Sequence, residues 1–215
     1  MIHSEATASH TADLLLQINA INLNLAAPYT WASGWRSPIY TDNRVTLSFP
    51  EVRTYLKEQF AALVKQRFNE CELVAGVATA GVAHGALLAD ALNVPYCYVR
   101  SAPKSHGMTN LIEGKALAGQ KTVVVEDLIS TGGSSLSAVS ALREAGCEVI
   151  GLVAIFSYGF DKAEQNFRDA RCAYYTLTDY HHVIDRALQR NFIGPGEMDS
   201  LRAWRQRPEA WHQSV

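Results

Sequence analysis

The chain has 215 residues, of which 48% are hydrophobic, so it can bury one sizeable core. Its net charge of −2 gives no electrostatic reason to expect a nucleic acid or a membrane surface as a partner. No apolar run approaches the length of a membrane span, and the first thirty residues lack a basic segment followed by an apolar one. The four cysteines are widely spaced without a C-x-x-C pair, which favours neither a zinc site nor a disulfide framework. We therefore expect a single-domain, cytoplasmic protein.

The N-terminal part of the chain predicts one helix and a small β appendage. Leucines and isoleucines recur at helical spacing within residues 10–25, which indicates a first helix. Residues 27–44 alternate β-forming residues with turn residues, and their prolines exclude a continuous helix. We expect short antiparallel strands there, separate from the main sheet. Ser48 and Glu51 then have the spacing of a capping box, and the helix that they open is expected to run to about Phe68.

From Glu72 onwards, predicted strands and helices alternate regularly, which is typical of a parallel sheet with right-handed crossovers. We therefore predict an α/β fold with a central parallel sheet flanked by helices. Residues 194–196 form a helix break between two short helices near Val183 and Leu201. The expected strands cover residues 73–77, 96–100, 149–156 and 174–177 and the run that begins at Val123, and the expected helices cover residues 81–92, 135–145 and 162–170.

The most informative stretch begins at Val123. A short apolar run ends in two adjacent carboxylates, Glu126 and Asp127, at the strand end where open α/β sheets bind their ligands. The small residues from Leu128 to Ser134 lead into a helix, and such a loop offers backbone N–H groups and a helix dipole to a phosphate. There is no Walker A lysine and no G-x-G-x-x-G. A phosphate site beside two acids favours a phosphorylated sugar, and an ordinary βα turn with an accidental acid pair is the alternative.

Two further loops are candidates for phosphate chemistry. Residues 76–81 form a small-residue loop between a strand and a helix, which fits either a second anion site for a diphosphate or tight strand–helix packing. The loop that follows Arg100 is about 20 residues long, carries Lys104 and His106, and contains two glycines that fit the hinges of a lid. A solvated basic loop is the plainer interpretation, but a diphosphate nearby favours a lid that brings positive charge with the substrate.

The acid pair and its loop resemble the phosphoribosyl-diphosphate signature of the type I phosphoribosyltransferases. Residues 31–34, residues 37–40, the loop from Arg100 to Gly107 and the phosphate loop follow one another in this order. From about residue 29 to residue 156 they resemble the orotate phosphoribosyltransferase family. The resemblance implies a magnesium-dependent, homodimeric glycosyltransferase of de novo pyrimidine (UMP) biosynthesis. Such an enzyme joins orotate to 5-phosphoribosyl 1-diphosphate and releases orotidine 5′-phosphate and diphosphate.

The resemblance also implies roles for individual residues. Lys104 and Asp127 would be catalytic, with Asp127 also bound indirectly to the metal, and Ser130 would contact the orotate. Residues 32–41 would form a hood over the base, and the lid would reach in from the neighbouring subunit. The chain, 1–215, would be a single domain with a hood at about 1–45 plus the C-terminal segment and a core at about 50–180. Phosphoribosyl diphosphate would contact Arg100, Lys104, His106, Glu126, Asp127, Leu128, Ile129, Ser130, Thr131, Gly132, Gly133 and Ser134.

The chain departs from the family pattern at three places. Ser101 and Ala80 stand where many members have lysines, and Tyr158 stands where some have a base-binding arginine. Arg36 and Arg44 are both candidates for binding the orotate carboxylate, and the sequence does not separate them. Two other functions stay open, namely transfer to another base such as a purine or uracil, and a non-catalytic regulator that senses phosphoribosyl diphosphate. The near-neutral charge, without a basic stripe, disfavours a regulator that binds nucleic acid.

Overall fold

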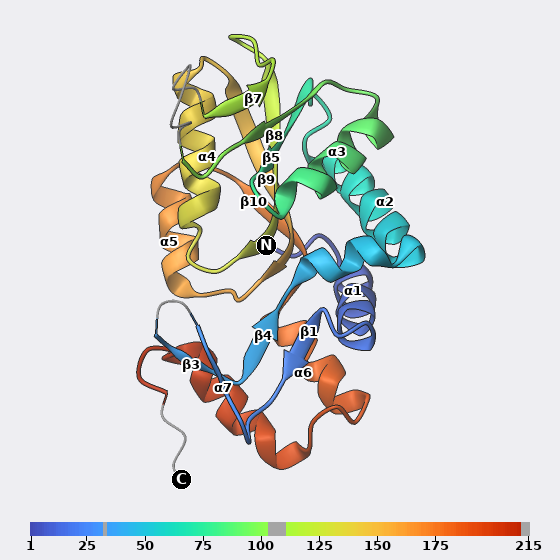
Figure 1. The fold of residues 1–215 in the computed structure, drawn as a ribbon, viewed down its shortest axis with the longest axis vertical. Coiled ribbons are helices and arrows are strands. Elements are labelled where there is room, and N and C mark those ends of the chain that lie inside the picture. The colour runs from blue at the N-terminus through green and yellow to red at the C-terminus, as the bar shows by residue number, and fades with distance from the viewer. Residues whose placement is uncertain (32–33, 103–110, 212–215) are drawn as a thin grey trace.

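The computed structural model describes residues 1–31, 34–102 and 111–211. Its centre is a six-stranded sheet in the order β10-β9-β8-β5-β6-β7 (Figure 1). All neighbouring strands are parallel except β6 and β7, which pair antiparallel at one edge. The predicted α/β fold with a mostly parallel sheet is confirmed. The strands span Leu73–Val77 (β5), Tyr96–Val99 (β6), Ile112–Gly114 (β7), Lys121–Ile129 (β8), Glu148–Ser157 (β9) and Tyr174–Asp179 (β10).

The strand order changes direction between β5 and β8. From β5 the chain crosses through α3 (Gly81–Leu92) to β6 on one side, and from β8 it crosses to β9 and β10 on the other. The carboxyl ends of β5 and β8 therefore lie at the topological switch point, where loops diverge and leave a crevice for ligands. Every residue of β5 is buried, and so is the valine run of β8, as expected for parallel strands that are covered on both faces.

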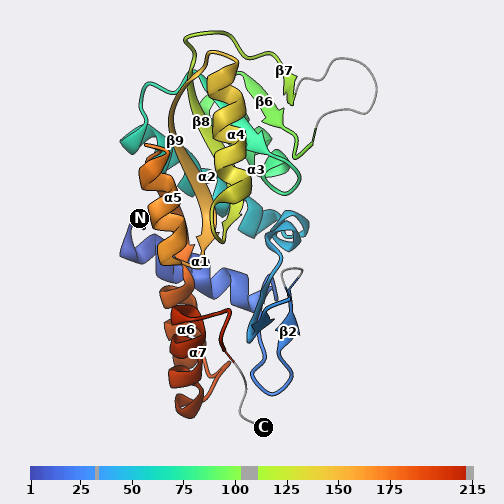
Figure 2. The ribbon, with the colours of Figure 1, turned by 90° about the vertical axis from the view of Figure 1, so that its left-hand side faces the viewer.

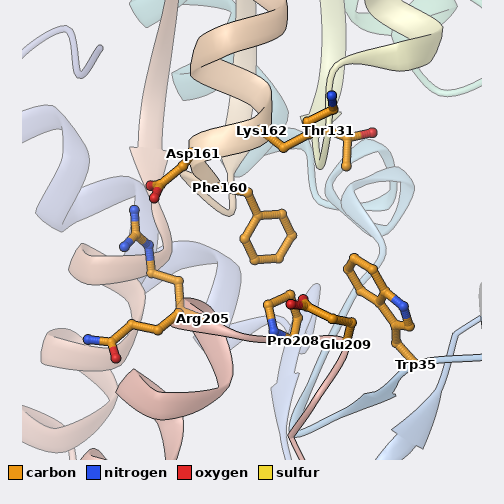
Figure 3. Close-up of a pocket in the computed structure, with 9 residues that line it drawn as sticks. Trp35, Thr131, Phe160, Asp161, Lys162, Arg205, Pro208 and Glu209 are labelled. Atoms are coloured by element: carbon orange, nitrogen blue, oxygen red, sulfur yellow. The ribbon is translucent and has the colours of Figure 1, made fainter.

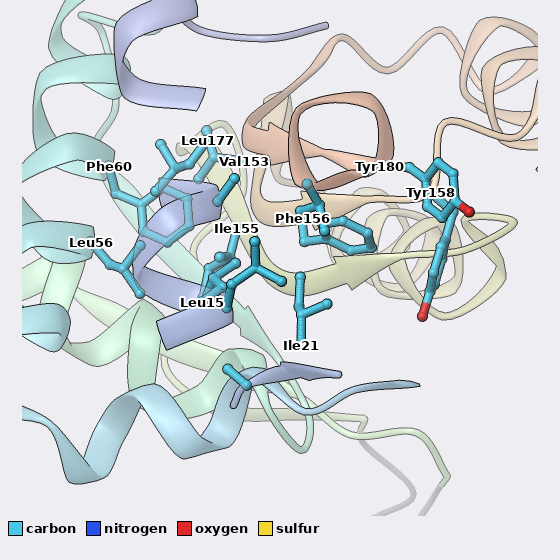
Figure 4. Close-up of a cluster of buried hydrophobic side chains, with 14 of the residues drawn as sticks. Leu15, Ile21, Leu56, Phe60, Val153, Ile155, Phe156, Tyr158, Leu177 and Tyr180 are labelled. Carbon is cyan, nitrogen blue, oxygen red and sulfur yellow. The ribbon is translucent and has the colours of Figure 1, made fainter. Parts of the chain in front are cut away.

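Helices cover both faces of the sheet, and each face has its own hydrophobic cluster (Figure 2). One cluster includes Leu15, Phe60 and Val153, which Figure 4 shows close together. The cluster on the other face includes Leu142 and Phe167. No helix in the described parts of the chain is long and apolar enough to cross a membrane. The first face is covered by α1 (Glu5–Gln17), α2 (Pro50–Arg67) and α3, and the second by α4 (Gly133–Glu144) and α5 (Asp161–Asp169).

A small appendage lies beyond the carboxyl ends of the central strands (Figure 1). It contains two antiparallel strand pairs, β1 with β4 and β2 with β3. β2, β3 and β4 confirm the antiparallel strands predicted within residues 27–44, whereas β1 precedes that range. Helix α7 packs beside it, and Trp204 donates from Nε1 to the main-chain oxygen of Arg36 at 3.0 Å. The strands and helices of the appendage, and those that connect it to the sheet, are β1 (Ile21–Leu23), β2 (Tyr29–Thr30), β3 (Arg36–Ser37), β4 (Ile39–Thr41), η1 (Asn43–Ser48), α6 (Tyr180–Gln189), η2 (Pro195–Glu197) and α7 (Met198–Gln206).

The prediction of a first helix over residues 10–25 was wrong at both ends. The helix begins at Glu5, because Ser4 caps it by accepting a hydrogen bond from the main-chain N–H of Thr7 at 3.1 Å. It ends at Gln17, and Asn19 then adopts a left-handed conformation with φ of 56°. The isoleucine and leucine that follow belong to β1, so their apolar spacing reflects a strand that also faces the core.

The capping box predicted at Ser48 was also wrong. Helix α2 begins at Pro50, and its N-cap is Phe49, whose side chain makes no capping hydrogen bond. Ser48 is instead the last residue of η1. Proline at the first helical position is favourable because its fixed φ suits the helix and its missing N–H would have no partner there. Strand β7 was not predicted, because three residues inside a long loop give no periodic signal.

Candidate active site

The two acids predicted to hold the sugar lie together at the carboxyl end of β8. Glu126 has only 4% of its surface exposed, and its Oε2 accepts hydrogen bonds from Ser135 Oγ at 3.2 Å and Ser134 Oγ at 3.4 Å. Its Oε1 accepts a hydrogen bond from the main-chain N–H of Asp127 at 3.1 Å. The strand and the first turn of α4 therefore hold the pair from two sides, which defines its geometry.

Burial and mutual repulsion disfavour ionisation of both carboxyl groups together. Burial, and secondly the negative charge of Asp127, raises the pKa of Glu126 to about 8. Burial also raises the pKa of Asp127. Ionisation of the second carboxyl group is therefore disfavoured at neutral pH. A ligand that brings hydroxyl donors or positive charge would stabilise the ionised pair, and sugar hydroxyls or a hydrated cation are such ligands.

The predicted phosphate loop connects β8 to α4. Gly132 has a φ of 82°, and a Cβ there would lie 2.7 Å from the ring of Phe167, so both the conformation and the available space require glycine. Asn166 of α5 donates from Nδ2 to the main-chain oxygen of Thr131 at 2.8 Å and so supports the loop. Gly132 is also the N-cap of α4, and it has no side chain that could occupy the first N–H groups of the helix. Those groups are therefore available to an anion.

Leu128 and Ile129, which were predicted to contact the phosphate, lie within β8 rather than in the loop. The side chain of Ile129 is fully buried, and its main-chain oxygen accepts a hydrogen bond from the N–H of Tyr158 at 3.1 Å. Residues 130–134 form the turn and the start of α4. This shorter segment is therefore the part of the predicted stretch that is placed to present N–H groups to a phosphate.

The loop after β5 lies directly against the acid pair. A Cβ on Gly81 would come within 2.5 Å of the main-chain oxygen of Val125 and within 3.3 Å of Glu126 Cα. Only glycine lets α3 approach β8 this closely. A Cβ on Gly76 would likewise lie 2.8 Å from the main-chain oxygen of Gly81, so tight packing explains both glycines of the stretch. The predicted diphosphate loop, residues 76–81, includes the end of β5 and the first residue of α3. The same packing brings its middle part, residues 78–80, to the end of the sheet that carries the acids.

Arg100 follows β6 at the same end of the sheet, where the carboxyl ends of the parallel strands meet. Its guanidinium Nη1 lies 3.6 Å from Oε1 of Glu113, which belongs to the neighbouring strand β7. Lys104 and His106, the other two predicted cations, lie outside the described residues, as do residues 32–33 of the predicted hood. The structure thus brings Arg100, the acid pair and the phosphate loop to one edge of the sheet.

The two arginines considered for the orotate carboxylate have different surroundings. Arg44 makes a two-point ion pair with Asp42, in which Nε lies 2.6 Å from Oδ1 and Nη2 lies 2.9 Å from Oδ2. Burial raises the pKa of Asp127, the positive charge of Arg44 opposes that rise, and the negative charge of Asp42 adds to it. Arg36 lies in β3 of the appendage with its side chain exposed. Arg44 is therefore the candidate whose charge acts on the acid pair.

Tyr158 joins the core to the appendage at the position where some members of the resembled family have an arginine. Its ring is buried, and its hydroxyl donates to Thr41 Oγ1 at 3.2 Å. Arg205 of α7 donates from Nε to the main-chain oxygen of Tyr158 at 3.3 Å and also donates to the carbonyl of Gly159. The sequence reasoning missed Arg205, because a contact between residues so far apart leaves no local pattern.

A cavity of about 270 Å³ lies between the phosphate loop, the start of α5 and the end of α7 (Figure 3). Aromatic side chains form part of its wall, and Lys162 and Arg205 bring positive charge to it. Neither Glu126 nor Asp127 lines it, so the cavity is separate from the acid pair. Its lining residues are Trp35, Thr131, Phe160, Asp161, Lys162, Arg205, Gln206, Pro208 and Glu209. The candidate site for a sugar phosphate is the acid pair with its two loops, because carboxylates, free N–H groups and the switch point coincide there.

Comparison with known proteins identifies the class of enzyme to which the chain is similar. A family model described as "Phosphoribosyl transferase domain" matches residues 51–189. The orotate phosphoribosyltransferases of Bacillus subtilis and Bacteroides fragilis are 55% and 54% identical to this chain over 196 and 200 residues, which cover 91% and 93% of this chain and 91% and 94% of those proteins. The crystal structure of orotate phosphoribosyltransferase from Aeropyrum pernix superimposes with a TM-score of 0.73 at 26% identity, covering 85% of this chain and 99% of that one.

The chain therefore belongs to the orotate phosphoribosyltransferase family, a group of pentosyltransferases of pyrimidine biosynthesis. The match confirms the resemblance that the acid pair, the phosphate loop and the Arg100 loop indicated in the sequence.

Proposed function

We propose that this chain transfers the phosphoribosyl group of 5-phosphoribosyl 1-diphosphate to orotate. The observation that carries the proposal is the arrangement at the switch point. A buried acid pair is followed directly by a loop and an uncapped helix start, and an appendage lies beyond the same strand ends. The acids suit the ribose hydroxyls, the helix start suits the 5′-phosphate, and the appendage suits a hood over the base.

Each predicted residue then has a role in the proposal. Glu126 and Asp127 hold the ribose hydroxyls. The main chain of residues 130–134 binds the 5′-phosphate, and Leu128 and Ile129, at the end of β8, hold this loop in position for the phosphate. Ser130 contacts the orotate. Arg100, Lys104 and His106 bind the diphosphate, and all three reach in from the neighbouring subunit.

In the proposed reaction the bond from C1′ of the ribose to the diphosphate oxygen breaks, a bond from C1′ to a ring nitrogen of orotate forms, and the proton of that nitrogen passes to water or to the departing diphosphate. Orotate is already an anion at neutral pH through its carboxylate, which favours attack on a positively charged ribose, and the ring N–H can lose its proton as its bond to C1′ forms, so the reaction requires no strong general base. Positive charge develops on the ribose, and negative charge collects on the departing diphosphate. Catalysis comes from alignment of the two substrates and from cations placed against the leaving group. Lys104 is the side chain that we assign to that task.

A magnesium ion fits this donor set. Proteins usually hold Mg²⁺ through one or two carboxylates together with substrate phosphates. Burial raises the pKa of both Glu126 and Asp127, so a nearby cation would stabilise their ionised forms. Within the described ranges, no group of three or more His, Cys, Asp or Glu side chains could hold a metal by itself. As the family resemblance implies, Asp127 would hold the ion through water while the diphosphate supplies other ligands, and the bound ion would neutralise charge on the leaving group.

We further propose a homodimer with shared active sites, in which the loop after Arg100 covers the acid pair of the neighbouring subunit. Support for it comes from the family resemblance. The cytoplasmic location, the lack of a nucleic-acid or membrane partner and the boundary between hood and core stay predictions.

The proposed function can be tested by following the absorbance of orotate after phosphoribosyl diphosphate and Mg²⁺ are added. We expect orotate to be consumed only when both are present, and adenine, guanine, hypoxanthine and uracil to be left unchanged. Consumption of one of those bases in place of orotate would assign the chain to another base. Tight binding of phosphoribosyl diphosphate without consumption of any base would indicate the non-catalytic regulator.

A further inference from the structure

Asn43 connects the appendage to the acid pair. It is the first residue of η1, separated from the end of β4 by Asp42, and none of its surface is exposed. Its Nδ2 donates to the main-chain oxygen of Asp127 at 2.8 Å, although 84 residues separate the two along the chain. This bond acts on the peptide unit that directly follows the proposed sugar-binding carboxylate.

The chemistry of the partner determines how the amide of Asn43 is oriented. A main-chain carbonyl can only accept a hydrogen bond, so the NH₂ group of Asn43 must face Asp127. The other end of the amide then points elsewhere. Among the described residues, Oδ1 of Asn43 is buried and has no hydrogen-bond partner. A buried acceptor without a partner lowers stability, so packing alone does not explain an amide at this position.

A second layer of polar groups supports the main chain of Asn43. Thr46 Oγ1 donates to the main-chain oxygen of Asn43 at 2.6 Å, and Nε2 of His84 lies 3.4 Å from the same hydroxyl. Burial lowers the pKa of His84 to about 4, so its ring is neutral at physiological pH and adds no charge to the site. Because His84 belongs to α3, this network reaches from the appendage to the helix that follows the candidate diphosphate loop.

We infer that Asn43 is a positioning residue for the transferase reaction, fixing the main chain of Asp127 so that the acid pair faces the ribose hydroxyls. The inference rests on the proposed function, since it requires phosphoribosyl diphosphate at the acid pair. It assigns to the appendage a second task besides covering the base, which is to hold the sugar site in shape.

The test compares Asn43→Leu with the wild type under steady-state conditions. Leucine is close to asparagine in size and removes the hydrogen-bond donor. We expect the KM for phosphoribosyl diphosphate to rise by about 3- to 10-fold, as for the loss of one hydrogen bond, while the KM for orotate stays within about twofold. Asn43→Ser, whose hydroxyl is too short to reach Asp127, should give the same selective increase and serves if the leucine variant does not fold.

Thr178→Val is the matched control. Thr178 is also fully buried, and its Oγ1 donates to the main-chain oxygen of Ala8 at 2.8 Å, in β10 at the other edge of the sheet. Its loss should lower the melting temperature and leave both KM values unchanged. A wild type that does not consume orotate would overturn the proposed function. If the wild type is active, the role of Asn43 alone is overturned by either of two results. One is that both Asn43 variants keep the wild-type KM for phosphoribosyl diphosphate, and the other is that neither variant folds.

Discussion

The sugar-phosphate side and the base side of the site are built in different ways. On the sugar side, one continuous stretch from Val123 to Ser135 supplies the strand, the acids, the loop and the helix start. On the base side, contacts join residues that lie 117, 47 and 168 positions apart, as between Tyr158 and Thr41, Arg205 and Tyr158, and Trp204 and Arg36. Substitutions on the sugar side should therefore change kinetics first, whereas substitutions on the base side should change stability first.

The largest effect is expected on the base side, from Trp204→Ala. Trp204 is fully buried, and its ring centroid lies 5.5 Å from that of Trp31, 5.7 Å from that of Tyr158 and 5.4 Å from that of Tyr180. Loss of such a side chain lowers the free energy of unfolding by about 3–5 kcal/mol. Urea denaturation measures it, with Phe192→Ala, which is 53% exposed, expected to change it by less than about 0.5 kcal/mol. Equal losses for the two variants would contradict the stabilising role of this cluster.

On the catalytic side, Lys104→Ala should lower kcat by about 10²–10³-fold, because a cation placed against developing charge contributes mainly to the transition state. The KM for phosphoribosyl diphosphate should rise by a smaller factor. Lys115→Ala, an exposed lysine just after β7, is the control and should behave as the wild type. If the KM rose while kcat stayed at the wild-type value, Lys104 would be a binder of the ground state instead.

Asp127→Asn should keep the fold and weaken the hold on the sugar. Each charge-assisted hydrogen bond that is lost should cost on the order of 1.5–3 kcal/mol, which corresponds to a rise in the KM for phosphoribosyl diphosphate of about 10- to 100-fold. The comparison variant is Asp90→Asn, on the exposed side of α3. A correctly folded Asp127→Asn protein with wild-type kinetics would refute the role of the acid pair in binding the sugar.

Stability should depend on pH through Glu126. Burial and the charge of Asp127 raise its pKa from the ordinary value of 4.5 to about 8. The folded state therefore binds this proton more tightly than the unfolded state, so the stabilisation is present below pH 4.5 and is lost as the pH rises through 8. We expect the free energy of unfolding to fall by about 1–2 kcal/mol over that window. Chemical denaturation from pH 4 to pH 9 should show the decline in the wild type relative to Glu126→Gln, and parallel curves would contradict it.

The smallest expected effect is a partial recovery of activity, which tests whether the lid and the acid pair of one site belong to different subunits. Lys104→Ala and Asp127→Asn proteins would be mixed in equal amounts and allowed to exchange subunits, and activity would be measured at a phosphoribosyl diphosphate concentration far enough below the KM of Asp127→Asn that each variant is nearly inactive alone. About half of the dimers would then be mixed, each with one intact site out of two, so activity should return to about a quarter of that of the wild type. If exchange is verified and the mixture stays inactive, the lid closes over its own subunit.

Where one local pattern decides the structure, the sequence predicted it to the residue. β5 and α3 have the predicted bounds, because a fully buried apolar run and a small-residue loop set them. The acid pair and the turn after it were likewise predictable, since one stretch encodes all their parts. The predicted first helix extended too far because Ile21 of β1 also faces the core, and burial at helical spacing does not distinguish a helix from a turn followed by a strand.

The base side was not predictable from local patterns. The hydrogen bond from Tyr158 to Thr41 and that from Arg205 to Tyr158 exist only once the sheet, the appendage and α7 have come together. The same holds for Asn43, whose sequence neighbours suggest an ordinary turn. Ser135 is a partial exception, because it continues the hydroxyl-rich run after the acids and could have been assigned as a partner of Glu126.

The most direct test of the site is a crystal structure of the protein with phosphoribosyl diphosphate and Mg²⁺. We predict that the ribose hydroxyls lie within hydrogen-bond distance of Glu126 and Asp127, and that the 5′-phosphate accepts hydrogen bonds from the N–H groups of residues 130–134. A 5′-phosphate bound instead between Lys162 and Arg205 in the cavity of Figure 3, with no ligand atom near the acid pair, would contradict this assignment of the site.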